Sequence, residues 1–192
     1  MERRAGIVIL GTVALLVGGA VVLQSGLWVD LVGTGDYERG TVTVTERTTP
    51  TAATPTPTGT ATPGTTVAVR QSDAGPTLAT VEVRIADTTT KRYVGLSETD
   101  ELGPDEGMLF VHDEADTHAY VMRNMSFPLD IIFVDADGTI TTIHHASLPP
   151  PGDETLRRYE GRGKYVLEVN RGWTNRTGVE VGDRVELPAG VA

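Results

Sequence analysis

Asn124, Asp130, Glu168 and Asn170 are the polar residues whose types and positions could converge on a chemical site. Asp130 stands between Leu129 and Ile131, and a buried carboxylate in such an apolar run must be hydrogen-bonded or paired, because a bare one costs several kcal/mol. Strand periodicity places Met122 with Asn124 on one face, and Glu168 with Asn170 on one face of another strand. The candidate ligand pocket is therefore Met122, Asn124, Asp130, Glu168 and Asn170.

Three roles fit these residues. They could line a pocket that binds a sugar or a small solute, or Asp130 and Glu168 could serve as the acid and base of a hydrolase. They could also be structural, with Asp130 and Asn124 holding loop backbone and Glu168 paired with an arginine. Hydrolysis requires two carboxylates that face one cavity at a defined separation, which spacing in the sequence does not supply. We expect a binding or envelope-associated module with no catalytic residue, and an extracellular hydrolase that uses Asp130 and Glu168 is the alternative.

Histidine and cysteine patterns argue against a metal centre or a cofactor. The chain has no Cys, which excludes thiolate zinc sites, a cysteine nucleophile and disulfides. His144 and His145 are adjacent, so they point to opposite faces of a strand, and His112 and His118 flank an acidic run without a chelating spacing. We therefore expect no metal and no cofactor.

The elements that must position these residues begin at about residue 77. Alternating apolar and polar residues predict strands over 78–85, 107–111, 119–122, 129–134, 139–144 and 164–169. Asp87-Thr88 and Gly95 bound a short helix over 89–94, a single turn over 173–177 ends at Gly178, and 179–187 is expected to form a closing hairpin. Short strands between turns favour a mostly β fold, a compact antiparallel sandwich or jelly-roll-like domain over residues 77–192.

Five stretches of this region occur together and in order: VGLS from 94, GMLFV from 107, MRNMSFPLDIIFVD from 122, YVLEVNRGW from 165 and GVEVGD from 178. Over about residues 78 to 188 the chain resembles the domain-of-unknown-function 192 (DUF192) family, also called UPF0127. The resemblance implies a jelly-roll-like β fold that is often exported or membrane-tethered in prokaryotes, with no established activity. Many members carry Cys after the central hairpin, where this chain has His144 and His145.

An uncharged run from Ala5 to Leu23 follows Arg3 and Arg4. Its 19 residues would span about 28 Å as a helix, close to the thickness of the hydrocarbon core. We expect an uncleaved signal anchor in residues 1–32, with the N-terminus in the cytoplasm and the C-terminal domain outside the membrane. Residues 33–76 contain the Thr/Pro-rich run 41–66, which predicts a disordered stalk that adds nothing to the fold.

The charge is strongly negative, with 26 Asp+Glu against 16 Lys+Arg and a formal net charge of -10. An acidic surface disfavours nucleic acid as a partner, and the scarcity of Lys is typical of a halophilic protein that stays soluble in concentrated salt. The expected partners are the membrane and a small solute or sugar. Asn175, in an N-x-[ST] sequence, is a predicted glycosylation site, whereas Asn124 in a second such sequence is expected to stay unmodified because of packing.

Overall fold

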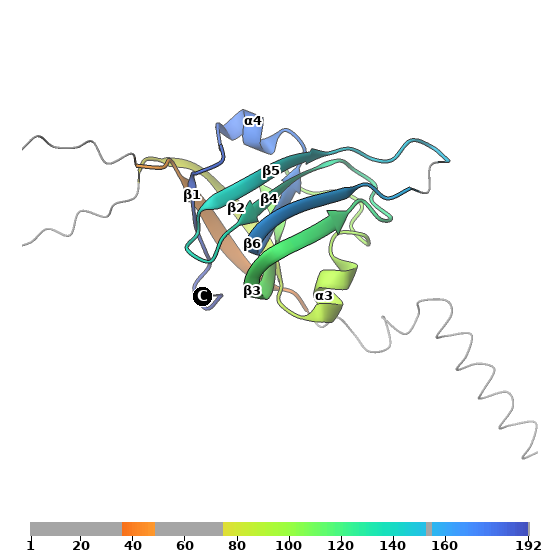
Figure 1. Ribbon diagram of the computed structural model, residues 1–192, viewed down its shortest axis with the longest axis horizontal. Helices are drawn as coiled ribbons and strands as arrows, with labels where there is room; N and C mark the ends of the chain where they lie inside the picture. The colour runs from red at the N-terminus through yellow and green to blue at the C-terminus, as the bar shows by residue number, and fades with distance from the viewer. Residues whose placement is uncertain (1–35, 49–74, 153–154, 192) are drawn as a thin grey trace, which may run out of the picture.

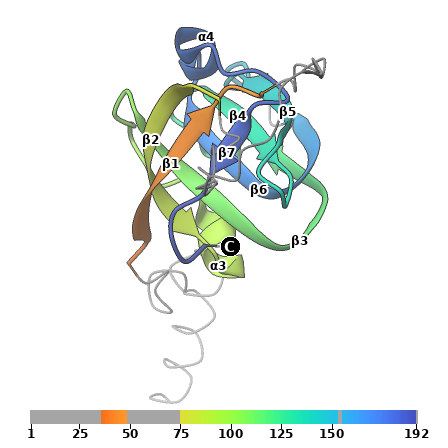
Figure 2. The ribbon, with the colours of Figure 1, turned by 90° about the vertical axis from the view of Figure 1, so that its left-hand side faces the viewer.

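The computed structural model describes residues 36–48, 75–152 and 155–191. These residues form seven strands and two short helices around one curled sheet (Figures 1 and 2). In chain order the elements are β1 (Glu38–Thr45), β2 (Thr77–Ala86), α3 (Thr89–Val94), β3 (Glu106–Val121), β4 (Leu129–Val134), β5 (Ile140–Ala146), β6 (Arg158–Asn170), α4 (Trp173–Thr177) and β7 (Arg184–Glu186).

The strands lie in the order β5-β4-β6-β3-β2-β1-β7. Every pairing is antiparallel except that of β2 with β3, which α3 connects by a crossover. The prediction of a mostly β, antiparallel fold is therefore confirmed, apart from this parallel pair. The expected two-sheet sandwich is not what forms, because the long strands β3 and β6 run continuously through a single sheet.

The two end strands of the sheet approach each other. Thr139, just before β5, forms a bridge with Arg184 of β7, and the backbone N–H of Ile140 donates to the carbonyl of Asp183 at 2.9 Å. The N–H of Val185 also donates to the carbonyl of Gly138 at 2.8 Å. This contact joins the two ends of the curled sheet and gives it a barrel-like form (Figure 2).

Both faces of the central strands are covered, which explains why every residue of β4 is buried. Ile132 and Val134 belong to one apolar cluster with Leu167 and Trp173. Ile131 and Phe133 belong to a second cluster on the opposite face. A residue's position in the strand alternation therefore decides which of two distinct environments its side chain enters.

Both helices form at the residues that local sequence signals predict. Thr88 caps α3, since its side chain accepts the N–H of Lys91, and the positive φ of +53° at Gly95 ends the helix. Gly178, with φ of +75°, ends α4 in the same way. The two helices lie at opposite ends of the curled sheet (Figures 1 and 2).

Several predicted strand boundaries differ from the structure. The strands expected over 107–111 and 119–122 are two parts of one 16-residue strand, β3, interrupted by a bulge between Val111 and Asp116. The polar run between them was not predicted as a strand. It bulges out of the ladder and is largely exposed. The closing hairpin over 179–187 is also wrong, since only Arg184–Glu186 is a strand and it pairs with β1.

The predicted stalk over residues 33–76 is wrong for Glu38–Thr45. These residues form β1, which pairs with β2 along its whole length and with β7, and Val42 and Val44 are fully buried. The alternation of Thr and Val gives one apolar face to the core, so the segment contributes to the fold. The Thr/Pro-rich run after β1 therefore connects two paired strands of the domain.

Within the described ranges, no helix combines the length and apolarity needed to cross a membrane. The predicted span Ala5–Leu23 and the run 49–74 lie outside these ranges.

Candidate functional site

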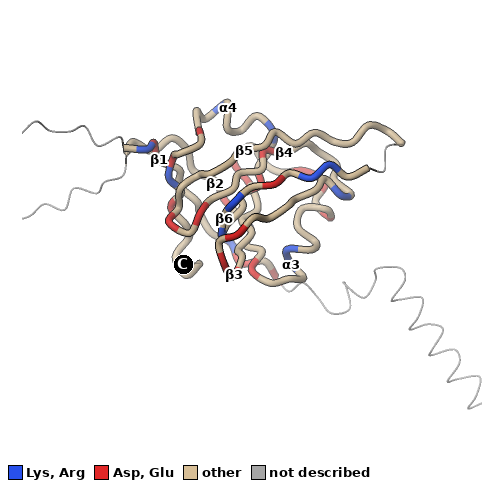
Figure 3. The backbone as a smooth tube through the Cα atoms, in the orientation of Figure 1, with Lys and Arg blue, Asp and Glu red and all other residues tan. Residues whose placement is uncertain are grey.

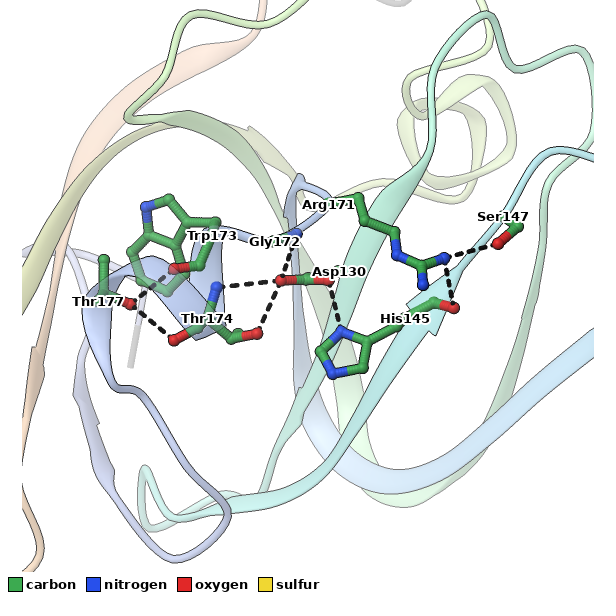
Figure 4. A network of polar contacts seen from close by, with 8 residues as sticks. All are labelled: Asp130, His145, Ser147, Arg171, Gly172, Trp173, Thr174 and Thr177. Atoms are coloured by element: carbon green, nitrogen blue, oxygen red, sulfur yellow. Dashed lines mark hydrogen bonds and ion pairs between the residues drawn. The ribbon is translucent and has the colours of Figure 1, made fainter.

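Asp130 is fully buried in β4 and accepts four hydrogen bonds (Figure 4). Its Oδ1 lies 2.7 Å from Nδ1 of His145. Its Oδ2 accepts the backbone N–H groups of Gly172 and Thr174, at 3.1 and 3.0 Å, and the hydroxyl of Thr174 at 2.7 Å. Gly172 begins α4 and has no side chain to cap it, so Asp130 supplies the missing acceptor from a neighbouring strand.

This environment makes Asp130 an ionised anchor. Burial alone raises its pKa, but the bonds from His145, Thr174 and Gly172 outweigh burial and hold the pKa below the ordinary value of 3.8. Protein groups engage both oxygens of the carboxylate. The structural role that the sequence left open for Asp130 is the one that this geometry supports.

Glu168 points to the other face of the sheet. In the register of β4 with β6, Asp130 lies opposite Val169 and Ile131 lies opposite Glu168. Paired residues share a face, so the Asp130 side chain enters the Trp173 cluster while Glu168 enters the cluster of Ile131. The sheet separates the two carboxylates that the hydrolase hypothesis placed together.

Glu168 is 6% exposed, and its carboxyl has no hydrogen-bond partner among the described residues. No arginine among the described residues pairs with Glu168, contrary to expectation. Burial alone raises the pKa of Glu168 from 4.5 to about 8, so the carboxyl is mostly protonated at neutral pH. A buried acid without a protein partner is the feature of this site that most requires a functional explanation.

The Glu168 side chain lines a pocket of about 390 Å³, here called the α3 pocket. The pocket is bounded by α3 and the turn after it, by β3, by Leu129 at the start of β4, and by the segment after β3. Its apolar lining comes mainly from Leu96, Phe110, Tyr120, Met125 and Leu129. The ring of Tyr120 meets that of Phe110 edge to face, with centroids 5.1 Å apart.

Three residues of β3 add polar groups to the α3 pocket. Nε2 of His112 lies 2.9 Å from the hydroxyl of Tyr120, and the ring of His112 stacks on that of His118 with centroids 3.6 Å apart. Burial and then the neighbouring His118 lower the pKa of His112 to about 4, so its ring is neutral at neutral pH. Nε2 of His118 is buried and has no partner within the described part of the chain.

Two arginines complete the lining of the α3 pocket. Arg92 of α3 donates through Nη1 to the carbonyls of Val111 and Asp87, at 2.6 and 3.0 Å. Arg123, after β3, lies over the ring of Tyr93 at 4.1 Å and donates through Nη2 to the carbonyl of Tyr93 at 2.6 Å. Both guanidinium groups are held in place by backbone carbonyls.

The five predicted pocket residues do not come together. Met122 is buried in the apolar cluster, Asn124 is exposed in a turn with φ of +53°, and Asn170 donates to the carbonyls of Leu102 and Gly103 at 3.1 and 2.9 Å. Asn tolerates the left-handed region better than other residues, so backbone conformation accounts for Asn124. Of the predicted set, only Glu168 lines the α3 pocket.

Sequence reasoning did not place Arg92, Phe110, His112, His118 or Arg123 at the site. Four positions of β3, namely 110, 112, 118 and 120, carry rings at even intervals, and this period-two pattern was the available signal. The bulge preserves the pattern, so both halves of β3 face the pocket. Residues of α3 line the pocket because α3 lies in the crossover between β2 and β3. The spacing of residues along the sequence does not reveal this arrangement.

Other predicted sites are placed as follows. Asn175 is exposed on α4, and Asn124 is exposed as well, so packing does not explain the expectation that Asn124 stays unmodified. His144 and His145 point to opposite faces as expected, since His144 Nε2 contacts the carbonyl of Glu160 at 2.8 Å while His145 contacts Asp130. Across the described residues, no group of three or more His, Asp or Glu side chains is arranged to hold a metal ion.

A protein-family model described as "Uncharacterized ACR", the DUF192 model, matches residues 69–187. The chain belongs to the DUF192 family. A solved Sinorhizobium meliloti structure, provisionally described as a transcription regulator, is 30% identical to this DUF192 protein, with a TM-score of 0.59 over 80% of this chain and 97% of that one. A solved structure of a protein of unknown function from Novosphingobium aromaticivorans is 31% identical, with a TM-score of 0.53 over 77% and 84% of the two chains. No curated protein matches the chain.

Proposed function

We propose that this DUF192 domain binds a small organic solute in the α3 pocket, and that the segment Ala5–Leu23 anchors it to the outer side of a membrane. The observation that carries the binding proposal is the Glu168 carboxyl, which is 6% exposed and lines the pocket without a partner among the described residues. The anchor is supported by the uncharged run and the preceding Arg3 and Arg4.

The pocket has the composition of a solute site. Leu96, Phe110 and Met125 give it an apolar lining, while Glu168 and Nε2 of His118 offer polar atoms that no described residue engages. Small-molecule sites typically combine a mainly apolar wall with a few convergent polar groups. A bound solute would supply the hydrogen bonds that Glu168 and His118 lack, and this gain favours binding.

Binding is better supported than either alternative. Hydrolysis by Asp130 and Glu168 would require one cavity, and the register places them on opposite faces of the sheet. The S. meliloti relative is described as a transcription regulator, but for this chain the net charge of -10 disfavours binding to the phosphate backbone of a nucleic acid. A pocket lined by rings and a neutral acid instead suits a compact organic molecule.

Thermal unfolding of the full chain in detergent with a panel of sugars, polyols, carboxylic acids and amides tests this function. A solute at 100 times its dissociation constant stabilises the folded state by about 2.7 kcal/mol, which shifts the melting temperature by several degrees. Ala119→Phe, a bulky change in the pocket lining, should abolish or weaken the shift. Glu180→Gln, outside the pocket, is the matched control.

A solute that stabilises the wild type and Glu180→Gln but not Ala119→Phe supports the proposal. Equal shifts in all variants would place binding elsewhere, and the absence of any shift across the panel would contradict the proposed function.

A further inference from the structure

We propose that the solute bound in the α3 pocket is a small organic monoanion, whose negative group pairs with Arg123 while its apolar body contacts the rings and aliphatic side chains within. This inference rests on the proposed function, because it names the ligand class of the same site.

The charge of the pocket lining is opposite to that of the protein. The whole chain carries a net charge of -10, and Figure 3 shows acidic residues on many strands and turns. The α3 pocket, in contrast, is lined by Arg92 and Arg123, and its single carboxyl is that of Glu168. Because burial keeps Glu168 mostly protonated at neutral pH, the lining carries two cationic groups and almost no negative charge.

Arg123 has donors available for an anion. It uses Nη2 for the carbonyl of Tyr93 at 2.6 Å, while its Nε and Nη1 groups have no acceptor among the described residues. Its Cζ lies 4.1 Å from the centre of the Tyr93 ring, and this cation–π contact together with the hydrogen bond restrains the guanidinium. A preorganised guanidinium with free donors matches a carboxylate, which accepts two parallel hydrogen bonds from such a group.

The remainder of the lining suits a body with one ring or a short aliphatic chain. Phe110, Leu96, Met125 and Leu129 present apolar surface. Glu168 in its protonated form donates a hydrogen bond, which favours a ligand oxygen, and it attracts a ligand cation less than a carboxylate would. A dianion would need donors from both guanidinium groups, whereas Nη1 of Arg92 already donates to the carbonyls of Asp87 and Val111.

Benzoate, benzamide and benzylamine are matched probes that share a ring and differ in charge. We expect benzoate to bind the full chain at least about tenfold more tightly than benzamide, and benzylamine to bind least, by calorimetric titration at pH 6.5 in about 1 M KCl. Equal affinity for benzoate and benzamide would overturn the monoanion inference.

Variants at the guanidinium groups identify the site of pairing. Arg123→Gln removes the charge and should weaken benzoate binding about tenfold, while Arg123→Lys should retain part of the affinity. Arg158→Gln is the control, because this arginine is exposed, pairs with Glu160 and lies outside the pocket lining. Unchanged benzoate affinity in Arg123→Gln would overturn the inference.

The pH dependence gives an independent readout. The other titratable or charged groups of the lining are Arg92 and Tyr93 from α3, His112, His118 and Tyr120 from β3, and Arg123 after it, while β4 contributes only Leu129. Ionisation of Glu168 above pH about 8 adds a negative charge beside the anion, so the benzoate affinity of the wild type should fall between pH 7 and 9. Glu168→Gln should bind benzoate with the same affinity across this range, and a fall equal to that of the wild type would contradict the role of Glu168.

The two proposals fail in different ways. If benzamide or a sugar binds in the pocket and benzoate does not, the monoanion inference is wrong while solute binding stands. If no probe and no member of the solute panel binds, both are wrong.

Discussion

Asp130 accepts hydrogen bonds from His145, Gly172 and Thr174, and these bonds join β4 to β5 and to the start of α4. Asp130→Ala leaves these donors unpaired inside the protein, so we expect a loss of about 3 kcal/mol in the free energy of unfolding. Chemical denaturation measures the loss, and Asp100→Ala at an exposed position is the control.

The pKa of Asp130 gives this prediction a pH signature. Because the folded-state pKa lies below the ordinary value of 3.8, the stabilisation is present above that value and is lost as pH falls through the folded-state pKa. Asp130→Ala should therefore lose less stability, relative to the wild type, in strong acid than at pH 7. Equal stability of wild type and variant at pH 7 would show that Asp130 is not an anchor.

Glu168 has the opposite linkage. Its folded-state pKa of about 8 exceeds the ordinary 4.5, so the contribution of Glu168 to stability should be greatest below pH 4.5 and fall by up to about 5 kcal/mol as pH rises to 8. Glu168→Gln has no proton to lose, and its unfolding free energy should lack this decline. Melting curves of both proteins and of Glu180→Gln, taken from pH 5 to 8, measure the slopes, and parallel slopes for wild type and Glu168→Gln would refute the assignment.

The burial and hydrogen bonding of Asp130 could be predicted from its apolar neighbours, and of the predicted pocket residues Glu168 lines the α3 pocket. Their separation could not be predicted, because it depends on the register of β4 with β6 and not on spacing along the chain. The pocket also escaped prediction, since Arg92 and Arg123 reach it only after α3 packs beside β3.

At the scale of elements, β1 is the strand whose removal tests the fold most directly. Val42 and Val44 are fully buried, and β1 pairs with both β2 and β7. A chain that starts at residue 67 lacks β1 and exposes the edges of both neighbours, so we expect it to show no cooperative thermal transition. A chain that starts at residue 36 retains β1 and should unfold cooperatively, and a cooperative transition in the shorter chain would show that β1 is dispensable.

Elements with strong local signals could be predicted almost to the residue, as β4, α3 and α4 show. The helices have caps in the sequence, and β4 is a continuous apolar run. β1 was missed because its Thr residues merge with the Thr/Pro-rich run, although Val42 and Val44 carry the period-two pattern of a strand. The joining of both halves of β3 depends on a bulge, which has no comparable signature here.

At the scale of the whole molecule, the net charge of -10 predicts a salt requirement. Repulsion among like charges destabilises the compact state, and concentrated salt screens it. We expect the melting temperature to rise by at least about 5 °C between 0.2 and 2 M KCl, beyond the rise caused by sorbitol at equal osmolality. A melting temperature that is independent of KCl would contradict a halophilic adaptation.

The position of β1 before the Thr/Pro-rich run changes what proteolysis would do to a membrane-anchored protein. A cut in a linker between anchor and domain sheds the domain, but a cut within residues 49–74 would leave β1 on the fragment that carries the proposed anchor, paired with β2 and β7. With a protease recognition sequence inserted in this run, both fragments should separate on a denaturing gel yet sediment together with membranes. Release of the C-terminal fragment into the supernatant would show that β1 alone does not retain it. Noncovalent pairing of β1 with β2 and β7 would thus hold the two fragments together and make the domain resistant to shedding.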